Sequence, residues 1–538
     1  MQPIAYFSAE YAFDDLPIFA GGLGVLATDY LMRVAEDTQP FVMIGLFYHY
    51  GFENADGSES AKLDPLRSGW ELVTQNDEPL RAVVTINAEK IAFQAWTKSF
   101  GNSRVYLIDC DLADNPDNVK ALTNHLYAAD FEQKVVQDAL LGLGGVELLD
   151  RLGITPQLYH LNEGHSALAI LALLKLHRRQ KKHATLQELC QGVQESVVAT
   201  KHTVLSAAGL YITHNLFLQI FSTYLAEAEL PLEEVFAIAQ DPLRKDEFST
   251  TRLMLELSRD VNAVSRLHAV YEKKNHPNSP YTISSITNGI HLPRWQDEAI
   301  AQADTPDALW QAHSAARRRL IDFVNDRTKS QLDPEVLTVV WARRITAYKR
   351  PLELFNDINA LQHLMNSTER PVQIIIAGKP NSEDEAGVDM ARRLGEHALN
   401  TDFQGKLVYL QSYDLEIARY LVQGADVWLN TPDRGYEASG TSGMKAGSNG
   451  VLQCSVSDGW VDEVKLEMIG WKLPDVNAAD AIYGHIEHEI ASLFYERNES
   501  GIPEAWCKLM EQTIKVIEKD YTTTRMLEEY KQQLYRLG

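Results

Sequence analysis

The chain has 538 residues, of which 45% are hydrophobic and 23% charged, and its formal net charge is −24. A chain of this length and composition is expected to form two globular domains. The negative charge argues against nucleic acid or an anionic membrane as a partner, because binding to either requires a basic surface. A neutral polysaccharide remains compatible, and so does a small anion held in a local basic pocket.

The first half of the chain begins with a short apolar run followed by glycines. We expect strands near residues 4–7, 42–46, 82–86 and 105–109, and helices such as 138–152 and 167–174. Gly21-Gly22-Leu23-Gly24 precedes apolar residues at helical spacing, which predicts a glycine turn that opens a helix. Free N–H groups at such a helix start can face a phosphate, although on its own the pattern slightly favours a simple tight turn.

The second half alternates apolar runs with helical periodicity. We expect strands at 336–341, 372–377, 407–410 and 427–429, with helices at 352–365 and 415–422. This alternation predicts βα units around a parallel sheet, and therefore a Rossmann-like domain. A break near Thr287-Asn288-Gly289, followed by Pro293, separates the two halves.

A dense basic cluster follows the strand expected at 336–341. Arg343, Arg344, Lys349 and Arg350 lie where the carboxyl end of that strand would place an anion. Arginine pairs bidentately with phosphate and lysine supplies a compact charge. Taken alone, such a cluster is more often a solvated helix start.

Residues 436–450 supply an acid, Glu437, a run of small residues, and a lysine, Lys445. Small residues let main-chain N–H groups approach an anion closely, and a helix that opens after them adds its positive end. A lysine one turn into that helix can hold an anion or form a Schiff base with an aldehyde cofactor. A Gly/Ser-rich loop with an ordinary surface lysine is the competing interpretation.

Cysteine usage and hydropathy indicate the compartment. The four cysteines are far apart in sequence and lack metal-ligand spacing, so we expect reduced thiols and no metal site. The apolar stretch 167–174 is only eight residues, too short to span a bilayer, and no signal peptide is visible. We therefore expect a cytoplasmic protein.

The segment Glu437-Ala438-Ser439-Gly440-Thr441, followed by Met444-Lys445, resembles the cofactor segment of the α-glucan phosphorylases, the glycogen, starch and maltodextrin phosphorylase family. Five further segments match in the family's order: residues 21–24, 161–165, 202–205, 286–290 and 343–350. The resemblance implies an α/β protein of the GT-B type, with two Rossmann-like domains that face each other across a cleft. We expect these domains at residues 1–288 and 289–510, with a helical segment at 511–538 that packs back towards the first domain.

The resemblance also implies roles for single residues. Lys445 would carry pyridoxal 5′-phosphate as a Schiff base, with Arg343, Gly22, Gly440, Thr441 and Ser442 around the cofactor phosphate. Arg344 and Lys349 would hold the substrate phosphate. The glucosyl unit would be bound by Leu23, His202, Asn288, Tyr348, Glu437, Ser439 and Gly440. The expected catalytic set is Lys445, Arg344, Lys349, His202 and Glu437, and residues 162–165 would support the wall of the site.

The implied reaction is phosphorolysis of an α-1,4-glucan by inorganic phosphate, with retention, giving α-glucose 1-phosphate. Two alternatives remain: a sugar-nucleotide glycosyltransferase of the same fold, and a non-catalytic glucan-binding relic. Retaining transferases often carry two glutamates eight positions apart near this segment, whereas this chain has Glu437 and Lys445. The chain is shorter than well-known members, so we expect hyperbolic kinetics without activation by AMP. A homodimer is expected by resemblance alone.

Overall fold

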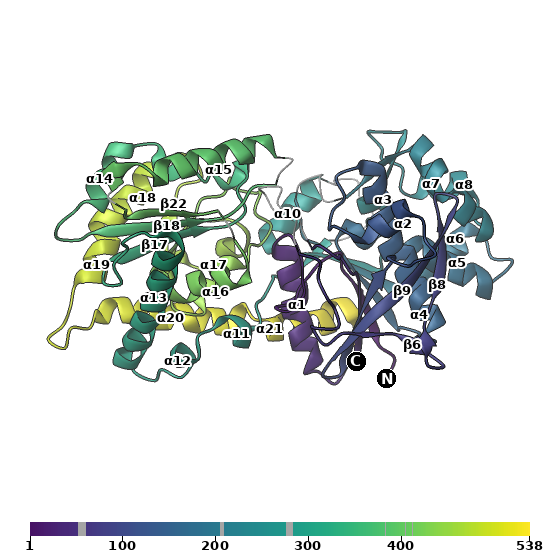
Figure 1. Cartoon of the computed structure of the whole chain (residues 1–538), viewed down its shortest axis with the longest axis horizontal. Helices are drawn as coiled ribbons and strands as arrows, with labels where there is room; N and C mark the ends of the chain where they lie inside the picture. The colour runs from purple at the N-terminus through teal and green to yellow at the C-terminus, as the bar shows by residue number, and fades with distance from the viewer. Residues whose placement is uncertain are drawn as a thin grey trace. The chain divides into compact units, whose positions relative to one another are not determined.

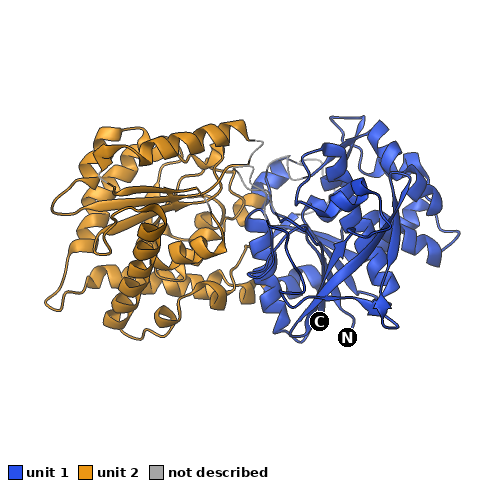
Figure 2. Ribbon diagram, viewed as in Figure 1, with its two compact units in different colours: residues 1–264, 269–286, 527–538 blue, residues 265–268, 287–526 orange. Residues whose placement is uncertain are grey.

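The computed structural model describes residues 1–51, 61–204, 209–275, 283–381, 384–403, 405–411 and 413–537. The chain divides into two compact units (Figure 2). Unit 1 comprises residues 1–264, 269–286 and 527–538, and unit 2 comprises residues 265–268 and 287–526. Leu205, the last residue of the segment that begins at His202, lies outside the described residues.

Unit 1 is built on a mainly parallel sheet. Its parallel strands lie in the order β16-β15-β12-β11-β1-β4-β10. They are β1 (Ile4–Phe7), β4 (Phe41–Leu46), β10 (Ser103–Asp109), β11 (Leu158–Asn162), β12 (Val197–Lys201), β15 (Asp260–Ala263) and β16 (Ile283–Ser285). The strand order reverses between β1 and β11, which is the topological switch point where doubly wound sheets bind ligands.

An antiparallel extension continues this sheet beyond β10. The long strand β9 (Glu89–Phe100) pairs with β10, with β5 (Glu71–Leu72) and with β8 (Ala82–Ile86). In the described part of unit 1, three short strand pairs lie apart from the sheet: β2 (Tyr11–Ala12) with β3 (Pro17–Ile18), β6 (Thr74–Gln75) with β7 (Glu78–Pro79), and β13 (Tyr211–Thr213) with β14 (Glu247–Ser249).

Helices of the first part of the chain connect these strands. They are α1 (Gly22–Ala35), α2 (Asp117–Lys120), α3 (Phe131–Ala139), α4 (Gly145–Arg151), α5 (Ala169–Gln180), α6 (Leu186–Ser196), α7 (His214–Glu227), α8 (Leu232–Ile238), α9 (Thr250–Glu256) and α10 (Arg266–Asn275). The helix expected at 138–152 is instead α3, a π-helical turn at Leu140–Gly144, and α4. Gly142 of this turn and Gly145, the first residue of α4, both pack closely against their neighbours. A Cβ on Gly142 would lie 2.3 Å from the main-chain nitrogen of Ala169, and a Cβ on Gly145 would lie 2.5 Å from the Phe7 ring.

Unit 2 contains a six-stranded parallel sheet in the order β19-β18-β17-β20-β21-β22 among the residues that the structure describes. The strands are β17 (Leu337–Ala342), β18 (Val372–Ala377), β19 (Leu407–Leu410), β20 (Val427–Asn430), β21 (Leu452–Val456) and β22 (Gly470–Leu473). In chain order this is 3-2-1-4-5-6, the order of dinucleotide-binding sheets, with the switch point between β17 and β20. The sequence prediction of a Rossmann-like second half is therefore confirmed.

Helices cover both faces of the unit 2 sheet, which explains why β17 and β18 are buried along their whole length. Figure 1 shows α14 (Ile358–Met365), α15 (Glu385–Ala398) and α18 (Ala479–His485) along one face, and α13 (Pro306–Thr328) and α16 (Leu415–Gly424) along the other. The remaining helices are α11 (Leu292–Trp295), α12 (Glu298–Ala301), α17 (Ser442–Gly447), α19 (Ala491–Tyr495), α20 (Glu504–Asp520) and α21 (Thr523–Glu529).

Three of the expected boundaries differ from the structure. The helix expected at 352–365 begins only at Ile358, because the Asp357 carboxylate caps it by accepting a hydrogen bond from the Ala360 N–H. The C-terminal segment that belongs to unit 1 begins at Leu527 and not near Glu511, because α20 packs on α13 and α17 within unit 2. Asn288, which the sequence placed at the end of the first domain, belongs to unit 2.

Candidate functional site

The carboxyl ends of β17 and β20 bring together the charged residues that the sequence indicated. Arg343 follows β17 directly, and its N–H donates to Ala377 O at the end of β18 (3.0 Å). Glu437 lies on the loop that leaves β20. Because both strands flank the switch point, two residues that are separated by roughly 300 Å of fully extended chain can meet at this edge of the sheet.

Glu437 forms the centre of a buried cluster of charges. Its Oε2 accepts a hydrogen bond from Lys349 Nζ at 2.9 Å and lies 3.2 Å from Arg343 Nη2. Burial alone would raise the pKa of Glu437, but Lys349 and Arg343 outweigh it and lower that pKa to about 2. Burial and the neighbouring Arg343 lower the pKa of Lys349 to about 8, against the pull of Glu437. Glu437 is therefore ionised at neutral pH.

This cluster retains hydrogen-bonding capacity for a ligand. Arg343 Nη1, Asn430 Oδ1 and Ser439 Oγ are buried and have no hydrogen-bond partner among the described residues. Arg343 and Asn430 line a small hollow together with Glu437, Gly440, Ser442 and Asp458. Since a buried donor on a cation without a partner is costly, the arrangement favours an anion in this hollow.

Small residues make the approach of the loop to this cluster possible. A Cβ on Gly440 would lie 2.8 Å from Glu437 Oε1 and 3.5 Å from Arg343 Nη2. Thr441 then precedes α17, as expected for a helix that opens just after the small residues. Lys445 lies in α17, is buried, and its Nζ is 4.2 Å from the centre of the Trp295 ring.

Asn288 lies beside the same loop. Its Nδ2 donates to Ser439 O at 3.1 Å, and its Oδ1 is buried without a hydrogen-bond partner in the described part of the chain. Thr287, its neighbour, donates to Glu463 (2.9 Å) and fixes the main chain there. The motif around Asn288 is thus part of the unit 2 site.

The remaining residues of the basic cluster have different surroundings. Arg344 is exposed and Tyr348 is partly buried. Burial and the nearby Glu437 raise the pKa of Tyr348 to about 12, so its hydroxyl keeps its proton. Its ring stacks on that of Tyr436 with 6.1 Å between centroids. Arg350, for which the sequence suggested a solvated position, is instead structural: its Nε donates to Thr431 O (2.8 Å).

Asp458 is a site residue that sequence reasoning missed. Its Oδ2 accepts from the N–H groups of Gly435 and Glu437 (both 3.0 Å), and its Oδ1 from that of Gly459 (2.9 Å). Burial raises the pKa of Asp458 to about 6, and the negative Glu437 adds to this effect. The signal for it in the sequence is the Asp458-Gly459 pair, a dipeptide that is typical of turns.

Unit 1 positions the other expected residues at its own switch point. Gly22 and Leu23 begin α1, which confirms the predicted glycine turn that opens a helix. Ala20 and Gly21 donate their N–H groups to Glu10 Oε2 (2.8 and 3.2 Å), and Glu10 is another residue that the sequence analysis did not single out. His202 follows β12, and its Nε2 lies 2.6 Å from Asn162 Oδ1 at the end of β11.

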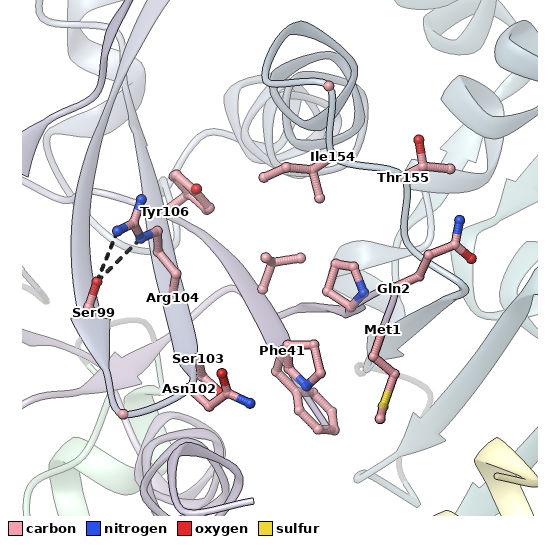
Figure 3. Close-up of a pocket in the computed structure, with 15 residues that line it drawn as sticks. Met1, Gln2, Phe41, Ser99, Asn102, Ser103, Arg104, Tyr106, Ile154 and Thr155 are labelled. Atoms are coloured by element: carbon pink, nitrogen blue, oxygen red, sulfur yellow. Dashed lines mark hydrogen bonds between the residues drawn. The ribbon is translucent and has the colours of Figure 1, made fainter. Parts of the chain in front are cut away.

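The large hollow of unit 1, about 670 Å³, lies at the opposite edge of the sheet. Figure 3 shows residues from the amino ends of β1, β4 and β10 around this hollow. The Arg104 guanidinium there donates hydrogen bonds to the Ser99 hydroxyl oxygen. Arg104 is the one charged side chain among the described residues that line it. The expected site residues line none of it, so it is distinct from the cluster at the carboxyl ends.

All four cysteines are free thiols, as expected. Within the described ranges, no group of three or more His, Cys, Asp or Glu side chains is arranged to hold a metal ion. No helix among the described residues is long and apolar enough to cross a membrane.

The two Rossmann-like sheets define an α/β protein, and the switch point of the unit 2 sheet carries buried cations beside small residues. A sequence profile described as carbohydrate phosphorylase matches residues 296–537. The chain is 32% identical to a glycogen phosphorylase of Aquifex aeolicus, over 99% of this chain and 86% of that protein. It is 30% identical to a maltodextrin phosphorylase of Thermococcus litoralis, over 99% of this chain and 70% of that protein.

An uncharacterized protein of Methanocaldococcus jannaschii is 29% identical over the full length of both chains. The similarity thus extends well beyond residues 436–450 and includes unit 1. The chain belongs to the carbohydrate phosphorylase family, the family of these glycogen and maltodextrin phosphorylases, which confirms the resemblance seen in its motifs.

Proposed function

We propose that the chain is a pyridoxal-phosphate-dependent α-1,4-glucan phosphorylase that transfers a terminal glucosyl unit to inorganic phosphate. The product would be α-glucose 1-phosphate with retained configuration. The observation that supports this most is the meeting of Arg343, Lys349 and Glu437 beside the loop that leads to Lys445. The relatives' names, glycogen and maltodextrin phosphorylase, support the choice of a glucan.

The residues present fit the cofactor. Lys445 is a buried amine on the wall formed with Trp295, and would hold pyridoxal phosphate covalently through Nζ. Arg343 Nη1 and Ser439 Oγ, buried and without a partner among the described residues, suit an anionic group. Gly440, Thr441 and Ser442 would add main-chain N–H groups. When bound, the cofactor supplies a phosphate that can exchange a proton with the substrate phosphate.

The two carboxylates among the described residues that line the hollow are both held by other groups of the protein. A retaining glycosidase uses two carboxylates about 5–5.5 Å apart, one as nucleophile and one as acid. Of the two carboxylates that line the hollow, Glu437 is ionised, and Asp458 accepts three main-chain hydrogen bonds. In our proposal the substrate phosphate fills both roles: its proton passes to the departing glycosidic oxygen, and one of its oxygens bonds to the anomeric carbon on the same face.

The chain's own residues bind and orient the reactants. Arg344 and Lys349 would hold the substrate phosphate, and Glu437 would accept a hydrogen bond from a glucosyl hydroxyl. Ser439, Tyr348 and Asn288 would add contacts to the sugar. For Gly22, Leu23 and His202 of unit 1 we propose the phosphate and sugar contacts that the family resemblance implies.

A visible absorption spectrum of the purified protein tests the cofactor assignment. Bound pyridoxal phosphate absorbs well above the protein band, so we expect a coloured protein that forms glucose 1-phosphate from glucan and phosphate. Lys445→Ala should lose both the stoichiometric cofactor and the activity, because it removes the amine that forms the covalent link. Lys465→Ala, an exposed lysine of the same unit, is the matched control and should keep both.

Borohydride reduction followed by peptide mass analysis locates the attachment. Cofactor mass on a peptide without Lys445, or a Lys445→Ala variant that still holds it covalently, would refute the assignment. A colourless wild-type protein that transfers glucose from a sugar nucleotide would instead identify the glycosyltransferase of the same fold.

A further inference from the structure

His202 is held from two sides by consecutive residues of one strand end. The Asn162 Oδ1 atom lies 2.6 Å from Nε2 of the His202 ring, and Glu163 Oε2 accepts a hydrogen bond from the His202 N–H at 2.7 Å. Asn162 is the last residue of β11, and His202 follows β12, its parallel neighbour. Asn162 therefore holds the imidazole ring of His202, and Glu163 holds the main chain of His202.

Glu163 adopts a backbone conformation that disfavours any residue other than glycine, with φ 73° and ψ 168°. Several hydrogen bonds hold it there: its N–H donates to Thr200 O (2.9 Å), and Ser166 Oγ donates to its carbonyl oxygen (2.9 Å). Its own Oε1 accepts from the Gly164 N–H (3.1 Å). A glycine would relieve the strain, so the presence of glutamate indicates that the carboxylate itself is needed.

The orientation of the Asn162 amide follows from its other partner. The Ser8 hydroxyl donates its proton to Glu10 O (3.0 Å), so its oxygen accepts from Asn162 Nδ2 (3.1 Å). The amide oxygen of Asn162 must then face His202, and Nε2 must carry a proton to bond to it. Ser8 thus determines the orientation of Asn162, and Asn162 determines the tautomer of His202.

The same hydrogen-bond network reaches the glycine turn. The main-chain oxygen of Glu10 accepts the hydrogen bond from Ser8. The side-chain Oε2 of Glu10 accepts hydrogen bonds from the N–H groups of Ala20 and Gly21. Its Oε1 accepts from the Tyr127 hydroxyl at 2.5 Å. Two buried carboxylates therefore accept hydrogen bonds from main-chain N–H groups next to the β1–β11 switch point: Glu10 on the β1 side and Glu163 on the β11 side.

We propose that Asn162 and Glu163 are positioning residues for His202. Asn162 fixes its ring as the Nε2–H tautomer, and the strained Glu163 fixes its main chain. The proposal rests on the proposed function in one respect, that His202 contacts the glucosyl unit. It requires neither residue to touch the substrate.

Nitrogen NMR of the full-length holoenzyme labelled with ¹⁵N-histidine tests the tautomer directly. The His202 signals are assigned by their loss in His202→Gln. In the wild type at pH 7.5 we expect the Nε2–H tautomer; the Nδ1–H tautomer would overturn the proposal. Asn162→Asp places a negative charge at Nε2 and should convert the ring to the imidazolium, whereas Asn162→Ala should give a mixture of tautomers. Asn118→Asp, an exposed asparagine of α2, should leave the signals unchanged.

Kinetics and hydrogen exchange test Glu163. In Glu163→Gln an amide N–H₂ replaces one accepting oxygen, so we expect faster amide exchange at residues 201–203. We also expect kcat/KM for glucan to fall about ten- to a hundred-fold, with KM for phosphate changed less than about twofold. Glu163→Gly, which relieves the strain, should show the same loss. Glu195→Gln, on the exposed side of α6, is the matched control.

The two proposals fail in different ways. If the wild type shows no phosphorolysis, the proposed function fails, while the NMR and exchange measurements still report on His202. If Glu163→Gly keeps full kcat/KM for glucan and wild-type exchange at residues 201–203, the carboxylate has no positioning role and this inference is wrong.

Discussion

Lys349 is a buried cation whose charge changes within the pH range of ordinary assays. Burial and the neighbouring Arg343 lower the pKa of Lys349 to about 8. As pH rises through 8 the ammonium loses its proton, while Glu437, with a pKa of about 2, remains negative. The local positive charge available to a phosphate therefore decreases as pH rises.

We expect KM for phosphate to rise about tenfold between pH 7 and 9.5, since one charge-assisted contact is lost. Initial rates at varied phosphate, with glucan saturating, measure this. Lys349→Arg keeps the charge at pH 9.5 and should remove most of the slope, whatever its effect on the absolute rate. The exposed Lys515→Arg serves as control. A wild-type KM that is flat over this range would show that Lys349 does not bind the phosphate.

Among single residues, the sequence predicted those that lie in chemically distinctive motifs. It did not predict the carboxylates that accept hydrogen bonds from main-chain N–H groups. Arg343, Lys349 and Glu437 are conspicuous because cations and an acid follow strand ends. Asp458 and Glu10 are not, because their partners are N–H groups of loops some twenty and ten residues away in the chain. Only the folded chain shows which loop faces such a carboxylate.

The conformation of the loop before α17 requires a glycine at position 440, because there is no room for a Cβ atom there. A Cβ on Gly440 would lie 2.8 Å from Glu437 Oε1, and that carboxylate is held by Lys349 and Arg343. Gly440→Ala should therefore displace Glu437 from its cations. The loss of one charge-assisted contact corresponds to about 1.5–3 kcal/mol, or roughly ten- to a hundred-fold in kcat/KM.

Gly484→Ala provides the matched comparison, because a Cβ on Gly484 in α18 meets no atom within 4 Å. Alanine is about 0.5–1 kcal/mol better than glycine inside a helix, so this variant should be slightly more stable and fully active. Steady-state kinetics and thermal unfolding of both variants give the comparison. Equal activity of the two variants would contradict the role assigned to Gly440.

Strands that are almost entirely apolar were predicted at their observed bounds, as for Val372–Ala377 and Leu407–Leu410. β21 was missed because Leu452–Val456 alternates apolar residues with Gln453 and Ser455, although all five are buried. The structure satisfies these polar groups internally: Gln453 Nε2 donates to Val451 O (3.1 Å) and Ser455 Oγ to Val456 O (2.7 Å). Hydropathy cannot predict burial that depends on such tertiary partners.

The whole chain shows the same sheet order twice, but its two units are not consecutive in sequence. The last residues, 527–538, follow α20 of unit 2 and complete unit 1. There the Tyr535 hydroxyl lies 2.6 Å from that of Tyr30 and 2.8 Å from Nδ1 of His160. The stability of unit 1 therefore depends on residues that are synthesised after all of unit 2.

The direction of each hydrogen bond around Tyr535 can be assigned. Thr200 Oγ1 donates to Asn262 Oδ1 (2.7 Å) and so accepts from His160 Nε2 (2.7 Å). His160 Nδ1 is then an acceptor, to which Tyr535 donates, and Tyr30 donates in turn to Tyr535. Burial lowers the pKa of His160 to about 3, which keeps the ring neutral as this arrangement requires.

Tyr535→Phe should destabilise unit 1 and leave unit 2 unchanged. The ring packing is kept, but two buried polar groups lose their partner, which corresponds to about 1–3 kcal/mol of unfolding free energy. Amide hydrogen exchange in β11 and β12 should accelerate, while that in β17 and β18 should not. Tyr495→Phe is the matched change in unit 2, where the hydroxyl donates to Pro371 O (2.7 Å), and it should give the opposite pattern.

Acid provides a second, independent measurement of the same contact. An unfolded histidine binds a proton near pH 6.5, whereas folded His160 does so only near pH 3, so its contribution to stability is present above about pH 6.5 and is lost as pH falls. Tyr535→Phe removes one donor to the neutral ring, but the burial that lowers the pKa of His160 remains, so exchange in unit 1 should be faster than in the wild type at pH 6.5 and at pH 4.5 alike. A variant with wild-type exchange in β11 and β12 at both pH values would show that the C-terminal segment does not stabilise unit 1.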